Sequence, residues 1–369
     1  MSLKLDSIDE ALAEISAGRP VVVVDDEDRE NEGDLIMAAD AATPEWVGFM
    51  VRHTGGVLCV PMPRADARRL QLHPMVSEND APLATAFTVS VDVREGLSTG
   101  ISALERSNTV RALADRDRVA DDFVRPGHIF PLIARDGGVL MRTGHTEAAV
   151  DLARLAGQTP IALISEIVHD DGSIQRGPDL EVFAKEHGLK IVSIDDLIAY
   201  RQARESLVTR VSDEEITTSI GPARAVVYET SFDQAQHVAV TFGDISDGHK
   251  VLTRFQREET VADVFHPDAS PIAAAMKRIE KEGRGIVVYL RHGAAGVVAH
   301  GDASRAPTDG TGDGAASDAA RHVQWREVGL GAQILKDLGI HSIQVLSTTE
   351  RQYFGLSGFS VEIAGTELI

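Results

Sequence analysis

Ten residues, numbers 25 to 34, concentrate carboxylate side chains directly after an apolar run. They read DDEDRENEGD and hold seven carboxylates, and the preceding run Val21–Val24 is typical of a buried strand. Ligand sites of α/β folds gather where such strands end. Crowded carboxylates repel one another, and a divalent cation together with the interleaved Arg29 would relieve the repulsion. The run therefore predicts a cation site, with Gly33 expected to allow a sharp turn. An acidic surface loop is the alternative.

Two further segments each carry a histidine. Residues 125–132, RPGHIFPL, are expected to place His128 after a Pro-Gly turn, as a chemical group or as a structural or surface histidine. Residues 142–152, RTGHTEAAVDL, place glycine and threonine where a helix begins. Backbone amides and a hydroxyl could hold a phosphate there, while Arg142 supplies charge and His145 reaches a metal. The alternative is an ordinary helix start with a satisfied histidine.

Glu166 follows the apolar run 160–164, so it lies at the end of an expected strand. Partial burial at such a position can raise a carboxyl pKa toward neutrality and suit the group to act as a general base. A surface salt-bridge partner is the alternative. Together, the acidic run, the two histidine segments and Glu166 suggest a metal-dependent enzyme that acts on a sugar phosphate. Oxygen-rich ligands favour Mg²⁺ or Mn²⁺ as the cation.

Mixed helical and strand patterns must position these groups, and none repeats at a fixed period. A helix is expected from a capping serine, Ser7, to Ile15, and further helices at 44–51, 104–113 and 146–156. Besides Val21–Val24, strands are expected at 56–60, 86–92 and 160–164. The first part therefore reads as mixed α and β structure.

A polar, helix-like stretch from Tyr200 to Val211 marks the expected domain boundary, giving domains 1–205 and 206–369. The second domain is expected to be α/β as well. It has strands at 223–229, 237–242, 285–290 and 342–346, helices at 272–281 and 331–338, and a loop at 300–319 rich in Gly, Asp, Ala and Ser.

Charge and cysteine count exclude several classes of function. The formal net charge is −21, with 21 basic and 35 acidic residues up to residue 205 and 15 and 22 after it. Neither part is basic, so we expect no nucleic-acid or membrane partner. Cys59 is the only cysteine, which leaves no intrachain disulfide and no thiolate-based zinc cluster. No stretch resembles a signal peptide or a membrane span, so a cytoplasmic protein is expected.

Residues 1 to about 200 strongly resemble 3,4-dihydroxy-2-butanone 4-phosphate synthase of riboflavin biosynthesis. The matching stretches are DDEDRENEGDLI (25–36), AFTVSV (86–91), STGIS (98–102), RPGHIFPL (125–132) and RTGHTEAAVDL (142–152). The resemblance implies an α/β homodimer with its active site near the subunit interface. It also implies conversion of ribulose 5-phosphate to a four-carbon phosphate and formate. The sequence departs from the family at Ala103–Ser107, which puts details of the substrate loop in doubt but not the reaction.

The resemblance also implies roles for single residues. Glu30 and His145 would bind the divalent cations, and His128 and Glu166 match positions essential for catalysis. Substrate contacts would come from the acidic loop, Glu166 and the segment before the helix: Arg29, Glu30, Asp34, Arg142, Thr143, Gly144, His145 and Thr146.

The second part is similar to GTP cyclohydrolase II in scaffold stretches such as Ala275–Ile279 and Gly329–Leu335. The three zinc-binding cysteines of that family are missing from the matching stretches at 256–263 and 266–270. We therefore expect an inactive, structural or regulatory second domain beside an active synthase. A fully bifunctional enzyme and a non-catalytic scaffold are the alternatives.

Overall fold

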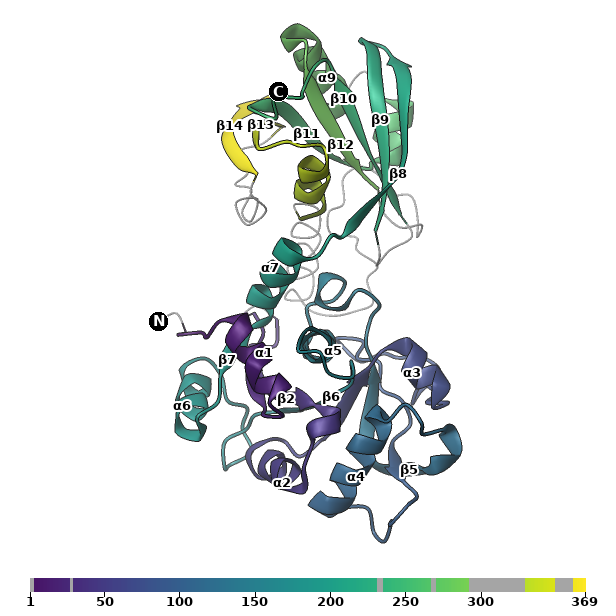
Figure 1. Ribbon diagram of the computed structural model, residues 1–369, viewed down its shortest axis with the longest axis vertical. Coiled ribbons are helices and arrows are strands. Elements are labelled where there is room, and N and C mark those ends of the chain that lie inside the picture. Colours follow the sequence, from purple (N-terminus) through teal and green to yellow (C-terminus); the bar gives the residue numbers. More distant parts are fainter. Residues whose placement is uncertain (1–2, 27–28, 231–234, 267–269, 292–328, 349–360) are drawn as a thin grey trace. The chain divides into compact units, whose positions relative to one another are not determined.

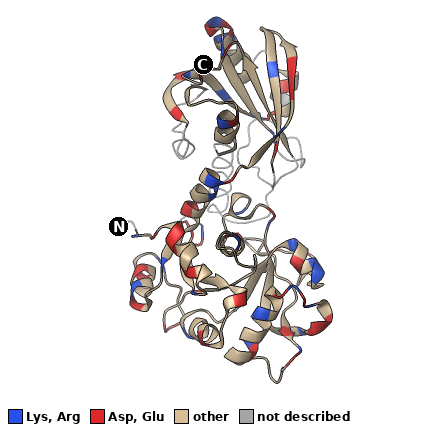
Figure 2. Ribbon diagram, in the orientation of Figure 1, with Lys and Arg blue, Asp and Glu red and all other residues tan. Residues whose placement is uncertain are grey.

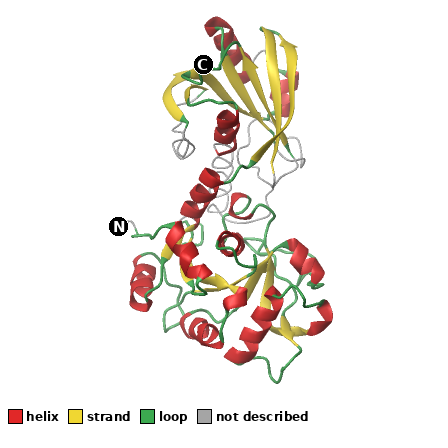
Figure 3. Ribbon diagram, viewed as in Figure 1, coloured by secondary structure: helices red, strands yellow, loops and turns green. Residues whose placement is uncertain are grey.

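The computed structural model describes all residues except 1–2, 27–28, 231–234, 267–269, 292–328 and 349–360. The described chain forms two compact units, which divide between Tyr200 and Arg201. Helices and strands alternate in the first unit, and strands dominate the second (Figure 3). This mixed α/β architecture confirms the expected fold class. Among the described helices, none combines the length and the apolar character that crossing a bilayer requires.

A seven-stranded mixed sheet forms the centre of the first unit, in the order β4-β5-β3-β6-β2-β1-β7. Neighbours pair antiparallel except β1 with β7 and β3 with β5. The strands are β1 (Val21–Val24), β2 (Gly33–Ala38), β3 (Cys59–Met62), β4 (Val91–Val93), β5 (Phe123–Ile133), β6 (Ala162–Glu166) and β7 (Ile191–Ser193).

Seven α-helices surround this sheet: α1 (Ile8–Ser16), α2 (Pro44–His53), α3 (Arg64–Arg69), α4 (Ala103–Ala114), α5 (His145–Leu155), α6 (Pro178–His187) and α7 (Ile194–Arg204). Ser7 caps α1 in a capping box with Glu10, as its sequence pattern predicts. The chain end and the later part of the unit lie side by side, where α1 meets β7 in Figure 1. The backbone N–H of Asp6 donates to Ile191 there at 2.7 Å.

Alternation along β2 decides which side chains reach the functional face. Leu35 and Met37 belong to the main hydrophobic core, together with Val47 and Met50 of α2. Because successive side chains of a strand point to opposite faces, Asp34 and Ile36 point the other way. The helices α1 and α5 contact β2. The acidic residue Asp34 is therefore held on a buried strand.

The second unit has its own seven-stranded sheet, in the order β14-β13-β11-β12-β10-β9-β8. Helix α9 (Pro271–Glu282) packs on β11 and β12 around Ala275 and Ile279, and α8 spans Thr260–Phe265. A further helix covers residues 329–337. The strands are β8 (Val208–Thr218), β9 (Gly221–Thr230), β10 (Gln236–Phe242), β11 (Val251–Arg257), β12 (Gly285–Leu290), β13 (Ser342–Ser347) and β14 (Glu362–Leu368).

Three local predictions are wrong. The helix-like stretch ends at Arg204, and β8 begins at Val208; this edge strand is exposed along most of its length, so it lacks the alternation that would have revealed it. The Pro-Gly pair before His128 lies inside β5 and makes no turn. Gly33 begins β2, where an added Cβ would lie 2.7 Å from Leu180, and the turn instead uses Asn31 with φ 54°.

Other boundaries shift by a few residues. The strand expected at 86–92 is ordered as a strand only over Val91–Val93, and that expected at 56–60 begins at Cys59. The expected loop at 300–319 lies outside the described residues.

Candidate active site

Four elements of the first unit end or begin at one place. Asp25 follows β1, Glu166 is the last residue of β6, and His145 is the first residue of α5. Asp34 lies on β2 between them, paired with Val23 of β1 and with Glu166 of β6. Residues from widely separated parts of the sequence therefore share one edge of the sheet, in the part of Figure 1 where α5, β2 and β6 are labelled.

The carboxylate of Asp25 organises the acidic loop. It accepts hydrogen bonds from the backbone N–H groups of Glu30 at 3.0 Å and Glu32 at 2.9 Å. Arg29 donates to Asp25 at 2.8 Å and also pairs with Glu30. The side chains of Arg29 and Asp25 are almost fully buried. The loop is thus a built structure whose arginine offsets part of its negative charge, which argues against a merely solvated acidic loop.

Asp25, Glu30 and His145 each bring one potential ligand atom to a common point. These atoms lie within 4.8 Å of one another, and this is the sole such grouping of His, Cys, Asp and Glu that the described residues form. The Nε2 atom of His145 donates to the carbonyl of Val23 at 3.1 Å. Its Nδ1 atom therefore faces Glu30 at 3.7 Å and Asp34 at 3.9 Å. A backbone bond that fixes one ring nitrogen and frees the other suits a metal ligand.

Electrostatics at this point match a missing positive charge. Burial lowers the pKa of His145, but Asp34 and Glu30 outweigh it and raise that pKa to about 9. Burial raises the pKa of Asp34 to about 7, with Glu166 and Glu30 adding to the effect and His145 opposing it. The Oδ1 atom of Asp34 is buried without a hydrogen-bond partner in the described structure. A divalent cation among these groups would offset their mutual repulsion.

Glu30 behaves differently, because its pKa is lowered to about 2. Burial alone would raise the pKa, but His145 and Arg29 act more strongly in the opposite direction. Glu30 is therefore ionised throughout the physiological range, as a hard cation requires of its ligand. The donor set of carboxylates and one imidazole fits Mg²⁺ or Mn²⁺.

The segment before α5 has the features of an anion site. Gly144 is the N-cap residue, and no side chain caps this end of the helix. Backbone amides of the first turn are thus available to a ligand. Arg142 lies beside them and pairs with the buried Glu147 at 2.7 Å. A Cβ atom at Gly144 would collide with the Arg142 guanidinium, so glycine is needed for this close approach.

His128 does not join this cluster within the chain. It lies on β5, and β3 stands between β5 and the Glu166 strand β6. Its ring pairs instead with Asp92 of β4, at 2.7 Å. The structure thus brings together Arg29, Glu30, Asp34, His145 and Glu166, with Arg142 to Thr146 beside them, but leaves His128 apart.

Two residues with evident structural roles received none from the sequence. Asp25 was part of the acidic run, and its place directly after the strand was the signal that could have separated it from its neighbours. Asp92 is a single acid in the alternating stretch 86–92, and nothing local to it indicates a histidine 36 residues later.

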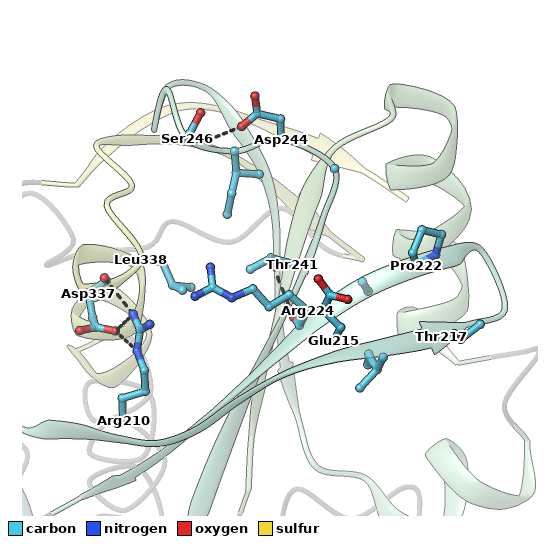
Figure 4. A pocket seen from close by; sticks show the side chains of 14 residues that line it. Arg210, Glu215, Thr217, Pro222, Arg224, Thr241, Asp244, Ser246, Asp337 and Leu338 are labelled. Carbon is cyan, nitrogen blue, oxygen red and sulfur yellow. Dashed lines mark hydrogen bonds and ion pairs between the residues drawn. The ribbon is translucent and has the colours of Figure 1, made fainter.

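The second unit shows no comparable site among its described residues. Its open pocket of about 790 Å³ lies beside β8, β9 and residues 337–338 (Figure 4). Two arginines line the pocket, but Arg210 already pairs with Asp337 at 2.6 Å and Arg224 pairs with Asp213. Basic and acidic side chains are interspersed over both units (Figure 2).

Comparison with known families accounts for both units. The family model of 3,4-dihydroxy-2-butanone 4-phosphate synthase matches residues 9–200, and that of GTP cyclohydrolase II matches residues 209–367. Riboflavin biosynthesis protein RibBA of Nocardia farcinica is 48% identical, over 98% of this chain and 89% of its own. The "monofunctional riboflavin biosynthesis protein RIBA 2, chloroplastic" of Arabidopsis thaliana is 47% identical, over 97% and 76%.

Solved structures agree with these matches. RibBX, a two-domain 3,4-dihydroxy-2-butanone 4-phosphate synthase from A. baumannii, superposes with a TM-score of 0.81 and 36% identity, covering 98% of this chain and 99% of its own. A 3,4-dihydroxy-2-butanone 4-phosphate synthase in complex with two magnesium ions covers 54% of this chain and 98% of its own, with a TM-score of 0.53 and 43% identity. The chain is therefore a member of the 3,4-dihydroxy-2-butanone 4-phosphate synthase family, an enzyme of riboflavin biosynthesis whose second domain belongs to the GTP cyclohydrolase II family.

Proposed function

We propose that the first unit converts D-ribulose 5-phosphate to L-3,4-dihydroxy-2-butanone 4-phosphate and formate, with the help of Mg²⁺ or Mn²⁺. The observation that carries this proposal is the meeting of Glu30, Asp34, His145 and Glu166 beside the uncapped start of α5. Cation ligands, proton carriers and an anion site are thereby within reach of one small molecule.

Glu30 and His145 are the proposed cation ligands, with Asp25 as a further candidate. A bound divalent cation would supply Lewis-acid polarisation of substrate oxygens. The solved family structure that contains two magnesium ions supports this choice of cation class. Arg29 keeps Asp25 and Glu30 in place through its two ion pairs.

The phosphate group is proposed to bind at the start of α5. Arg142 supplies a positive charge, Thr143 and Thr146 supply hydroxyl groups, and Gly144 lets the ligand approach the backbone. Because Arg142 is also paired with Glu147, its guanidinium is held in one orientation.

Proton transfers are proposed to use Glu166 and Asp34. These carboxylates occupy directly opposite positions on β6 and β2. A pKa of about 7 lets Asp34 take up and return a proton near neutral pH. The reaction needs no water or redox partner, because the five carbons of the substrate divide into four and one.

A homodimer is the proposed functional form. Within one chain His128 is two strands away from Glu166 in the sheet order. If His128 acts in catalysis, a second copy is the source that can bring it to the cluster. An active site near the subunit interface would meet this requirement.

The second domain, residues 206–369, is proposed to be structural or regulatory and not to hydrolyse GTP. The family's zinc site depends on thiolates, and the chain's single cysteine, Cys59, is buried in β3 of the first unit. Glu259 stands near the position of the first zinc cysteine. The names of the whole-chain relatives are divided, since one Arabidopsis protein is called monofunctional and another bifunctional.

Formate release in two separate assays tests the proposal. Purified protein would be given ribulose 5-phosphate with Mg²⁺ in one assay, and GTP with Zn²⁺ in the other. Formate from the sugar phosphate alone is the expected result. Formate from GTP would overturn the proposal for the second domain, and formate from neither substrate would favour a scaffold.

A further inference from the structure

The ring of His128 is held by a buried carboxylate at the opposite edge region of the first sheet. Asp92 accepts from His128 Nδ1 at 2.7 Å with one oxygen, and from the His128 backbone N–H at 2.9 Å with the other. The Asp92 residue is 3% exposed, whereas the His128 side chain keeps 40% exposure. The carboxylate is thus fixed inside the protein, while part of the ring remains open to solvent.

Two glycines make room for this pair. At Gly127 a Cβ atom would collide with the backbone of Val91 and Asp92, so β4 and β5 approach there as closely as glycine permits. At Gly100, with φ +82°, a Cβ would collide with the Asp92 carboxylate and would lie 2.6 Å from His128 Nδ1. The pairing between β4 and β5 shifts register directly after Val91. This irregularity turns Asp92 toward the histidine instead of leaving it in a regular ladder.

Arg106 of α4 balances the buried carboxylate. Its residue exposure is 7%, and burial lowers its pKa while the charge of Asp92 acts in the opposite direction. An unpaired buried carboxylate would be costly, whereas one placed between a guanidinium and an imidazole is not. Three elements, β4, β5 and α4, therefore cooperate to place one negative charge behind His128.

We propose that Asp92 is a positioning residue that keeps the proton of neutral His128 on Nδ1 and presents Nε2 to the substrate. A carboxylate accepts hydrogen bonds but donates none when ionised, so the ring nitrogen that faces it must carry the proton. The other nitrogen is then the one that can accept a proton and return it. This inference rests on the proposed function, in which His128 takes part in the reaction.

Asp92→Asn tests the inference, because the amide keeps the size of the side chain and reverses its hydrogen bonding. With the amide oxygen accepting from the His128 backbone, the NH₂ group faces Nδ1 and forces the ring proton to Nε2. We expect kcat for formate release from ribulose 5-phosphate to fall by about 10²- to 10⁴-fold, the range that a wrong tautomer costs in a comparable His–Asp pair. KM and the Mg²⁺ concentration for half-maximal rate should stay within about twofold, because the variant leaves the cation ligands untouched.

Ring ¹⁵N chemical shifts give a readout that does not depend on activity. The His128 resonances, assigned through His128→Gln, should report the Nδ1–H tautomer in wild-type protein and the Nε2–H tautomer in Asp92→Asn. Asp66→Asn is the matched control, since Asp66 is also a buried aspartate but pairs with Arg69 on α3. It should retain the wild-type His128 signals and kcat.

An Nε2–H tautomer in wild-type protein would overturn the inference even if the Asp92 variant did not fold. A wild-type kcat in folded Asp92→Asn would overturn it as well. If wild-type protein releases no formate at all, the proposed function fails, and the tautomer measurement still decides the role of Asp92.

Discussion

Asp34 and Glu166 face each other across the antiparallel pair β2 and β6, as direct register partners on neighbouring strands. Side chains at such positions lie side by side on one face of the sheet. Like charges there are destabilising, and the protein retains the pair in a buried setting where Glu166 helps to raise the pKa of Asp34. Carboxylates held together against their repulsion are typical of groups that bind a cation or share a proton.

Replacing Glu166 with alanine should abolish turnover without unfolding the protein. The substitution removes a proposed proton carrier, so we expect kcat to fall by at least about 10²-fold. It also removes one repulsion with Asp34, so the melting temperature should not decrease. Rate and melting curves measure the two effects, with the exposed Glu186→Ala as control. Near-wild-type activity in Glu166→Ala would remove Glu166 from the mechanism.

Replacing His145 with alanine should weaken the dependence on the cation. His145 offers Nδ1 to the site while Nε2 is held by the Val23 carbonyl. Losing one ligand should raise the Mg²⁺ concentration for half-maximal rate by about tenfold or more. A titration with Mg²⁺ at saturating ribulose 5-phosphate measures this, and an unchanged midpoint would rule out the assignment.

Stability without a divalent cation should decrease as the pH rises from about 6 to 9. The pKa of Asp34 is raised to about 7 and that of His145 to about 9 in the folded chain. The folded state therefore holds more protons than the unfolded state in this range, and stability falls as they are lost. Glu30, with a pKa of about 2, stays ionised and adds no slope there.

Thermal melting in EDTA at several pH values measures this slope. Mg²⁺ should raise the melting temperature more at pH 9 than at pH 6, because proton loss frees the ligand atoms. Asp34→Asn is the control and should flatten part of the slope. A melting temperature that rises from pH 6 to 9 in EDTA would contradict the electrostatic account of the cluster.

Two inactive variants should restore activity when combined, if His128 reaches the cluster from a second copy. His128→Ala and Glu166→Ala would be unfolded together, refolded and assayed. About half of the dimers would then be mixed, each with one intact site, so activity should recover to about a quarter of the wild-type value. Absence of recovery, with mixed dimers demonstrated, would place both residues in the same chain's site.

Local sequence patterns predicted the elements that hold the cluster. Val21–Val24, the helix start at His145 and the strand that ends near Glu166 are all regular, so periodicity and capping residues define them. The edge strand β8 and the strand β5 were missed, because exposure removes alternation and Pro126-Gly127 imitates a turn.

The part of the site that sequence could not supply depends on tertiary pairing. The contact of Asp92 with His128 arises from an irregular strand register and two close glycine approaches, and neither leaves a local signal. The same holds for the raised pKa of Asp34, which needs both the burial of β2 and the adjacent end of β6. Its role therefore became arguable once the fold was known.

The most direct test of the central claim follows ribulose 5-phosphate by ³¹P NMR while formate is quantified in the same sample. With Mg²⁺, the account predicts that a new phosphate ester and formate appear in equal amounts. It also predicts that both stop on addition of EDTA and resume with excess Mg²⁺ or Mn²⁺. Unchanged ribulose 5-phosphate in the presence of either cation, or equal turnover in EDTA, would contradict it.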